Sequence, residues 1–395
     1  MITGCRGDKP DGELSGRITI WHSWQAADAA VLQDVLARFG EIHPNVQITT
    51  LALPEDQILD EYKKAGNDGF GPGLLIGSNN WIGELVGTGF LRSITPDDLG
   101  GFLLNARNSA LIQYEDQLYG VPLFLAPNAL YYNKDLVKAV PDSLDELLQE
   151  AAAGNNVAFV PRFEEAYWGI QAFGEGLFDD QGRFTLANSG FMEWLSWLEI
   201  AQDASGAILN VDDQSLLELF VNGQIAYYVA GPEKQELILD MMDEPASFEF
   251  GVVPLPDGPY GPAGPLMPAE TILAYAHTSP EQTRIANALA AFLVNPQQGI
   301  HFMRELDRVP ANPAVRVDNR VYPVISGFSR QTRTGAILPN EIPRDRLTAA
   351  GNRAYVTVLS GVATPEEAVC RFGEDVAAFQ GYTADDMDWP EWCER

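Results

Sequence analysis

The chain has 395 residues, of which 46% are hydrophobic, and 55 acidic against 25 basic side chains give it a formal net charge of −30. This length exceeds what one hydrophobic core usually supports, which predicts two domains, and the apolar and aromatic content excludes a disordered chain. Such a negative field repels phosphate backbones and therefore argues against nucleic acid as a partner. The acidic residues are scattered, which is typical of a solvated surface; a cationic ligand is the alternative interpretation.

The N-terminal residues suggest a lipid anchor. No stretch reaches 18 uninterrupted apolar residues, so the sequence predicts no membrane span. The run 2–5 (Ile-Thr-Gly-Cys) resembles the end of a bacterial lipobox, in which Cys5 becomes the lipidated first residue of the mature protein. The polar, Gly- and Pro-containing run that follows suits a flexible tether. The alternative is that Cys5 is an isolated, unmodified cysteine.

Two more cysteines, Cys370 and Cys393, lie near the C-terminus. If the chain is exported, we expect them to form a disulfide that fastens the last segment to the body of the protein. If the chain is cytosolic, they are two thiols.

The first hundred residues alternate between predicted strands and helices. Apolar runs predict strands over 17–21, 45–51 and 73–77, and helical periodicity predicts helices over 28–43, 54–66 and 81–87. A β-α-β-α-β order with short links indicates a mostly parallel sheet flanked by helices. In open α/β sheets, ligands bind beyond the carboxyl ends of the strands.

The loops at those strand ends carry the candidate binding residues of this half. His22, Trp24 and Gln25 follow the first strand, and Asn80 and Trp81 follow the third. An aromatic ring beside amides suits a neutral polyhydroxylated ligand, because the ring packs on C–H groups while the amides bond the hydroxyls. Trp81 has a second interpretation, as a helix-start residue packed in the core. For His22, a hydrogen-bonding role is favoured over proton transfer.

The segment 119–136 separates this β-rich part from a mostly helical part. It contains two short apolar runs, 121–125 and 129–132, which predict strands on either side of a Pro-containing break. We expect it to carry the chain from one domain into the other. Further along, helices are predicted over 143–153, 188–203, 215–221 and 280–293, and strands over 157–160, 225–230, 251–255 and 272–276.

The usual catalytic and metal-binding motifs are missing from the sequence. The four histidines are widely spaced, the cysteines show no CxxC spacing, and there is no GxSxG, GxxxxGK[ST] or strand-linked GxGxxG. We therefore expect no cofactor and no metal. Glu164, Glu165 and Glu270 are candidate carboxylates for glycoside hydrolysis, but acidic residues are so numerous here that this signal is weak.

Five motifs, taken in order, resemble the family-1 extracellular solute-binding proteins, the maltose-binding-protein-like receptors of ABC importers. The motifs are ITIWHSW with RFGEIHPNVQI, GPGLLIGSNNWIGELVGTGFLRSIT, LYGVPLFLAPNALYYNKDL, FVNGQIAYYVAGP, and VPANPAV. The resemblance runs from about Gly16 to the C-terminus. It implies an α/β, two-lobed periplasmic-binding-protein-like fold of type II, with mixed sheets flanked by helices and a ligand cleft between the lobes.

The resemblance also implies a domain division and a role. We expect residues 1–15 to be the lipid-anchor remnant and tether, 16–125 plus 270–318 to form lobe one, and 126–269 plus 319–395 to form lobe two. The implied protein is a monomer without catalytic activity that closes on a sugar-type ligand and docks on ABC importer permease subunits. It would lie in the bacterial periplasm or on the outer face of the cytoplasmic membrane, anchored through Cys5.

Three positions depart from the family pattern. Asn80 stands where the family often has an acid, Ala126 where many maltodextrin binders carry a glutamate, and Glu233 where a tryptophan platform is common. These departures predict a smaller ligand than a maltodextrin, such as a disaccharide or a glycosylated polyol of the osmolyte type, or a partly cationic one.

The resemblance places aromatic stacking from the second lobe at Tyr167 and Trp168. The complete set of predicted ligand-binding residues is His22, Trp24, Gln25, Asn80, Trp81, Asn128, Tyr167, Trp168, Glu233, Glu270 and Arg333. Two alternatives remain open: a glycoside hydrolase-like enzyme that uses paired carboxylates, and a peptide- or amine-binding receptor of the same fold.

Overall fold

The structure is a computed structural model that describes residues 13–99, 104–179, 181–242, 248–383 and 387–393. The chain forms two compact units. Unit 1 contains the chain up to Phe124 together with Glu270–Val315, and unit 2 contains Leu125–Ala269 and Arg316–Arg395. The chain therefore passes between the units three times. Cys5 lies outside the described residues.

Unit 1 is built on a six-stranded sheet in the order β13-β6-β12-β3-β1-β2. Strand β1 pairs in parallel with both β2 and β3, as the β-α-β-α-β pattern predicts, whereas β12 pairs antiparallel with β3. The strands are β1 (Gly16–His22), β2 (Val46–Ala52), β3 (Leu74–Ser78), β6 (Val121–Leu125), β12 (Ala269–Ala274) and β13 (Val309–Pro310). The sheet therefore joins the first third of the chain to the segment Glu270–Val315, which returns to unit 1 much later in the sequence.

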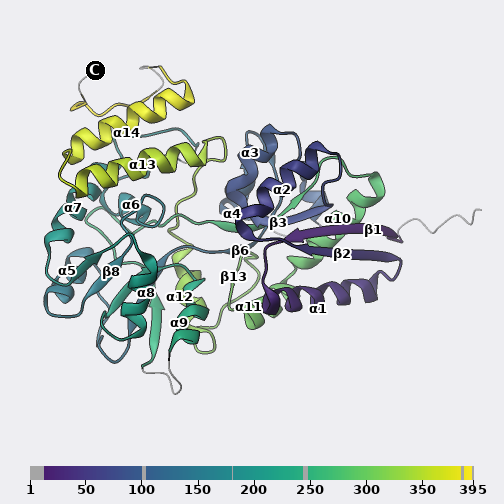
Figure 1. The fold of residues 1–395 in the computed structure, drawn as a ribbon, viewed down its shortest axis with the longest axis horizontal. Helices are drawn as coiled ribbons and strands as arrows, with labels where there is room; N and C mark the ends of the chain where they lie inside the picture. Colours follow the sequence, from purple (N-terminus) through teal and green to yellow (C-terminus); the bar gives the residue numbers. More distant parts are fainter. Residues whose placement is uncertain (1–12, 100–103, 180, 243–247, 384–386, 394–395) are drawn as a thin grey trace, which may run out of the picture. The chain divides into compact units, whose positions relative to one another are not determined.

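Helices flank this sheet (Figure 1). They are α1 (Ala26–Ile42), α2 (Glu55–Asn67), α3 (Ile82–Gly87), α4 (Ala106–Ile112), α10 (Pro280–Leu293) and α11 (Pro296–Leu306), with the short turns η1 (Asn79–Trp81) and η2 (Pro96–Leu99) and the hairpin β4 (Gln113–Tyr114) to β5 (Gln117–Leu118). Helix α1 buries Leu32, Val35, Leu36 and Phe39, the stripe expected from its periodicity. Across the described part of the chain, no helix has the length and apolar content that crossing a membrane requires.

Unit 2 has a five-stranded mixed sheet in the order β11-β7-β10-β8-β9. Its strands are β7 (Ala129–Asn133), β8 (Val157–Phe159), β9 (Ala207–Leu209), β10 (Tyr227–Ala230) and β11 (Phe250–Val253). Its helices are α5 (Leu144–Ala152), α6 (Ile170–Phe173), α7 (Phe191–Asp203), α8 (Asp213–Val221), α9 (Lys234–Met241), α12 (Pro323–Gln331), α13 (Arg344–Leu359) and α14 (Pro365–Gln380), with the turn η3 (Tyr167–Gly169). Strands β6 and β12 both run across a unit boundary, so the sheet of unit 1 supplies two of the connections.

An aromatic cluster fills the core of unit 2. The ring centroids of Trp168 and Trp194 are 4.5 Å apart, and those of Trp194 and Trp197 are 5.0 Å apart. A Cβ atom on Gly169 would lie 2.1 Å from the Trp194 ring, so only glycine allows this approach. Large aromatic rings bury much apolar area each, and this cluster therefore fixes η3 on helix α7.

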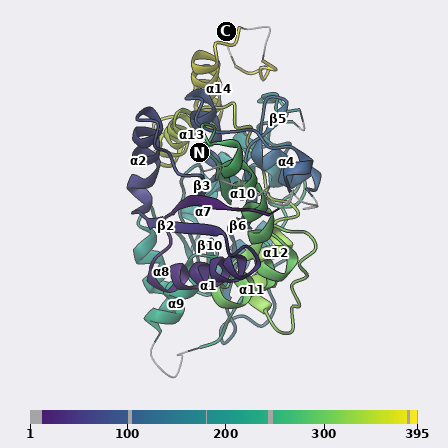
Figure 2. The same cartoon turned by 90° about the vertical axis from the view of Figure 1, so that its right-hand side faces the viewer.

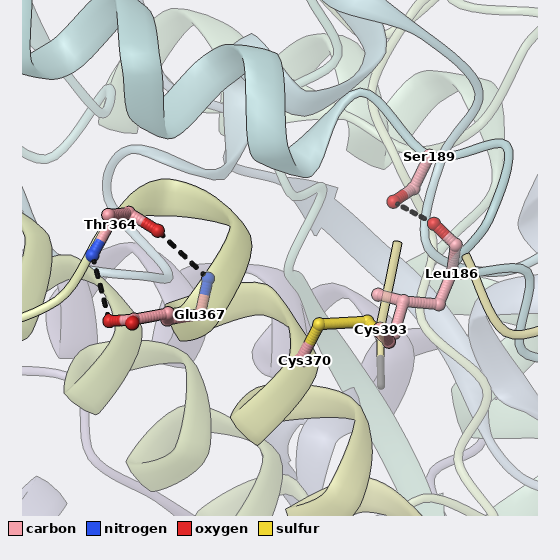
Figure 3. Close-up of a disulfide and its surroundings, with 6 residues drawn as sticks. All are labelled: Leu186, Ser189, Thr364, Glu367, Cys370 and Cys393. Atoms are coloured by element: carbon pink, nitrogen blue, oxygen red, sulfur yellow. Dashed lines mark hydrogen bonds between the residues drawn. A yellow bond between two sulfur atoms is a disulfide. The ribbon is translucent and has the colours of Figure 1, made fainter. Parts of the chain in front are cut away.

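Helices α13 and α14 pack against each other at the C-terminal end of unit 2 (Figures 1 and 2). Helix α14 begins with a capping box between Thr364 and Glu367, and Cys370 on its next turn forms a disulfide with Cys393 (Figure 3). The backbone N–H of Ala187 donates to the carbonyl oxygen of Asp388 at 3.1 Å, which ties the same tail to the loop before α7. The disulfide expected from the sequence is thus confirmed, and it fastens the tail to unit 2.

Replacing Cys370 and Cys393 together by alanine is expected to lower the free energy of unfolding by about 3 kcal/mol. The disulfide joins residues 23 apart in sequence and restricts the unfolded chain, so its loss stabilises the unfolded state. Guanidinium unfolding of the oxidised wild type and of the double variant measures the difference. Reduced wild type should behave like the variant; equal stability of the oxidised wild type and the variant would contradict this role.

Candidate functional site

The loop after β1 turns its first two predicted residues inward. The side chain of His22 is 1% exposed, and its Nδ1 accepts a hydrogen bond from the backbone N–H of Trp24 at 3.2 Å. Burial lowers the pKa of His22, which keeps the imidazole neutral and able to accept this bond. Gln25 is exposed at the N-terminus of α1 and makes no side-chain capping bond there. Of these residues, Gln25 presents its side chain to solvent.

Trp24 is enclosed within unit 1 rather than exposed for a ligand. Its side chain is 4% exposed, and its ring packs against Phe124 and Phe302 at centroid distances of 5.9 and 5.8 Å. The indole Nε1–H donates to Glu270. The ring and its polar atom are thus both engaged inside the unit, which leaves little of this side chain accessible to a ligand.

Glu270 belongs to a charged cluster with Arg308 and Asp28. Arg308 Nη1 donates to Glu270 Oε2 at 2.6 Å, and Arg308 Nη2 donates to Asp28. Burial raises the pKa of Glu270, whereas the positive charge of Arg308 and the bond from Trp24 oppose that shift. Both oxygens of Glu270 are bonded within unit 1, so this carboxylate orients its neighbours rather than offering itself to a ligand.

The loop after β3 presents an amide and an indole. Ser78 ends the strand, and its Oγ accepts from the backbone N–H of Asn80 at 3.1 Å, which starts the turn η1. Asn80 and Trp81 are half-buried. A Cβ atom on Gly77 would lie 2.1 Å from the ring of Trp81, so the indole lies directly over the backbone of β3. Trp81 therefore combines both interpretations, since it starts a helix and keeps part of its surface accessible.

In unit 2, helix α13 holds the segment that contains Glu164 and Glu165. Asn352 Oδ1 accepts from the backbone N–H of Phe163 at 2.9 Å, Thr348 Oγ1 donates to Glu164 Oε1 at 2.6 Å, and the hydroxyl of Tyr355 donates to the carbonyl oxygen of Ala166 at 2.8 Å. Three bonds within four residues fix this segment on one helix face.

The segment that follows the first passage between the units is hydrogen-bonded to the same segment, which contains Glu164 and Glu165. Asn128 Nδ2 donates to the carbonyl oxygen of Glu165 at 3.0 Å, and Asn128 lies four positions after the end of unit 1. Burial lowers the pKa of Arg344, while the negative charge of Glu164 opposes that shift. Glu165 pairs with Arg162 at 2.6 Å. This arrangement sets two carboxylates and an amide next to the chain crossing.

Tyr167 and Trp168, predicted to stack on a ligand, are core residues of unit 2. Their side chains are 1% and 0% exposed. The ring of Tyr167 packs edge-on against Phe163 at 5.4 Å, and Trp168 packs against Trp194. The turn η3 directs both rings into the apolar core, because burying their apolar surface stabilises the folded state. Neither ring has a face accessible to a ligand in this structure.

The remaining two predicted residues lie on other loops of unit 2. Glu233 is exposed just before α9, and its carboxylate folds back so far that a Cβ atom on Gly231 would lie 2.1 Å from Oε2. Burial raises the pKa of Tyr131, and the negative charge of Glu233 adds to that rise. Arg333 is exposed after α12. No group of three or more potential metal-ligating side chains occurs within the described ranges.

Comparison with known proteins identifies the family. A family model described as "Bacterial extracellular solute-binding protein" matches residues 34–321. The chain is 26% identical over 355 residues to a maltotriose-binding protein of Pyrococcus abyssi, covering 82% of this chain and 73% of the relative. It is 23% identical over 381 residues to a galactooligosaccharide-binding protein of Bacillus subtilis, covering 90% of this chain and 88% of the relative.

A solved structure shows the same fold. A cyclo/maltodextrin-binding protein complexed with maltotetraose matches with a TM-score of 0.82 at 20% identity, over 94% of this chain and 98% of the other. The family model covers most of the chain, so the chain belongs to the bacterial extracellular solute-binding protein family. The two-lobed α/β fold expected from the sequence motifs is confirmed.

Several residues of these clusters are absent from the predicted set. The predicted set omits Arg308, Asp28 and Arg344, because isolated charges in helices and loops carry no motif. Arg308 directly precedes the motif VPANPAV, which was its one sequence signal. The sequence points to Glu164 and Glu165 only as hydrolytic carboxylates. Their fixation by α13 depends on contacts from almost two hundred residues away, which local pattern does not encode.

The variant Gly77→Ala is expected to displace the indole of Trp81 and to lower the free energy of unfolding by about 1–3 kcal/mol, because the added methyl group overlaps the ring. Tryptophan fluorescence, near-UV circular dichroism and chemical unfolding measure the two effects. Gly87→Ala in α3 is the matched control, since its added Cβ atom meets nothing within 4 Å. If Gly77→Ala behaves like the control, with unchanged stability and spectra, then the indole of Trp81 does not pack on the backbone of β3.

Proposed function

We propose that this protein is the substrate-binding component of an ABC importer and binds a neutral sugar or glycosylated polyol between its two units. Family membership supports a binding role, and relatives with 22–26% identity are named for maltotriose, maltodextrin and galactooligosaccharide. The observation that carries the proposal is the fixed Glu164 carboxylate, oriented by Thr348 beside the chain crossing. A carboxylate held in place accepts hydrogen bonds from sugar hydroxyls at low entropic cost.

The proposed contacts come from both units. Unit 1 contributes the amides of Gln25 and Asn80 and the indole of Trp81, and unit 2 contributes Asn128 and Glu164. Amides and carboxylates satisfy hydroxyl groups, while an indole packs on the C–H face of a sugar ring. A ligand that touches both units favours the closed state, because only that state makes all the contacts.

The edges of the proposed site support a short ligand. Glu233 folds back over Gly231, at the position where the family resemblance implies a stacking tryptophan, and Ala126 offers no carboxylate. A site with fewer aromatic stacking surfaces can bind fewer sugar rings. A disaccharide, a trisaccharide or a glycosylated polyol fits this set better than a long maltodextrin. Glu233 and Arg333 remain candidates at the rim of the site.

We further propose that the protein binds its ligand without chemical conversion and delivers it, as a monomer, to permease subunits. Its relatives are binding proteins. The hydrolytic alternative would need a free pair of carboxylates, whereas Glu270 is bonded at both oxygens and Glu165 pairs with Arg162. Cys5, as a lipid anchor, would hold the protein at the outer face of the membrane.

Thermal unfolding with a panel of maltose, maltotriose, lactose and glucosylglycerol tests the ligand class. Ligand at about 100-fold its Kd is expected to add about 2.7 kcal/mol to the free energy of unfolding. Calorimetric titration should show one site per chain, and Glu164→Gln should weaken binding about tenfold or more, because the acceptor loses its charge. Glu249→Gln, at a surface pair with Lys134, is the matched control.

Three outcomes would overturn parts of the proposal. No shift with any sugar or polyol glycoside removes the ligand class. Appearance of shortened sugars during incubation points instead to a hydrolase. A strongly salt-dependent affinity for a cationic peptide or amine points to the other receptor class.

A further inference from the structure

Arg308 contacts four residues from distant parts of unit 1. Its guanidinium donates to Glu270 and to Asp28, and its Cζ atom lies 4.8 Å from the ring centroid of Trp24 and 5.3 Å from that of Phe124. A planar guanidinium is suited to this combination, since it donates in two directions and stacks on aromatic faces.

Two of these partners mark where the chain enters and leaves unit 1. Phe124 is the last residue before the first passage, and Glu270 is the first residue after the return. Their strands, β6 and β12, are neighbours in the sheet. Just beyond the boundary, the backbone N–H of Ala126 donates to the carbonyl oxygen of Pro268 at 2.9 Å. Arg308 therefore contacts the unit 1 residue at each of two adjacent connections, Phe124 at the first passage and Glu270 at the return.

The other contacts belong to the loops that we propose for ligand binding. Trp24 lies in the β1 loop beside Gln25, and Asp28 lies in the first turn of α1. Glu270 is in register with Ser78, the last residue of β3 before the Asn80 loop. Through one side chain, the β1 loop and the end of β3 are linked to the two connections.

The charges in this cluster make the link stiff. The side chains of Arg308, Glu270 and Asp28 are 27%, 22% and 25% exposed, so water screens them only partly. One cation lies between two carboxylates. Without it, Glu270 and Asp28 would repel each other and Trp24 would lose the charge over its ring.

We propose that Arg308 is a positioning residue that couples the ligand loops of unit 1 to the connections between the units. It touches no ligand. It fixes the angle at which the chain leaves unit 1 relative to the β1 loop, so that ligand contact at Gln25 is transmitted to the connections that bend on closure. This inference rests on the proposed function, and its first test does not require a ligand.

Hydrogen exchange of the ligand-free protein is that first test. In Arg308→Met, the backbone amides of Trp24 and Ala126 are expected to exchange about tenfold faster or more than in the wild type, because both lie next to the released cluster. Amides of β10 in unit 2 should be unchanged. Arg320→Met is the matched control, since that side chain is 89% exposed and pairs with Asp318. Unchanged exchange at both positions would overturn the proposal, whatever the ligand is.

Calorimetric titration with maltotriose is the second test. Arg308→Met is expected to weaken binding about tenfold or more, and Arg308→Lys to recover part of that loss, because lysine keeps the charge but lacks the planar fork. The double variant Arg308→Met/Glu270→Gln removes the unpaired charge at Glu270. It should recover thermal stability but not affinity. Full recovery of affinity would mean that Arg308 only neutralises Glu270. If the wild type binds no sugar, the proposed function fails, and the exchange result decides the role of Arg308.

Discussion

The antiparallel pairing of β12 with β3 is the constraint on which the rest of this protein depends. It returns the chain to unit 1 after an excursion of 145 residues, Leu125–Ala269, and inserts the returning strand between β6 and β3. A strand with hydrogen-bonded neighbours on both sides has its register strongly fixed, because a shift would break backbone bonds on both edges. That register sets Glu270 opposite Ser78, and Glu270 in turn bonds Trp24 and Arg308.

In unit 2, the candidate binding residues are fixed by hydrogen bonds from a helix rather than by strand pairing. Its carboxylates lie on an irregular segment, which on its own would be mobile. Helix α13 holds that segment with Thr348 and Asn352, and α14 covers α13 from the outside with its disulfide-fastened tail. A site assembled on a rigid helix keeps its geometry better than one assembled on a free loop.

The sequence predicts the helices and strands well, but it does not reveal which aromatic side chains are buried. Periodicity predicted α1 and the three parallel strands because their apolar patterns are local. The choice between Trp24 and Trp81 was not local: Trp24 is covered by Phe124 and Phe302, which lie 100 and 278 positions further along the chain. Trp168 is likewise covered from α7. Burial of a ring depends on long-range packing, which no single motif records.

The central proposal is that the protein binds a sugar-type ligand with contacts from both units and changes its conformation when it does so. Small-angle X-ray scattering, with and without a saturating ligand identified by calorimetry, tests this claim most directly. A smaller radius of gyration in the liganded protein is the expected result, because bridging contacts favour the closed state. An unchanged radius of gyration at full occupancy would contradict the account, since the ligand would then bind one unit alone.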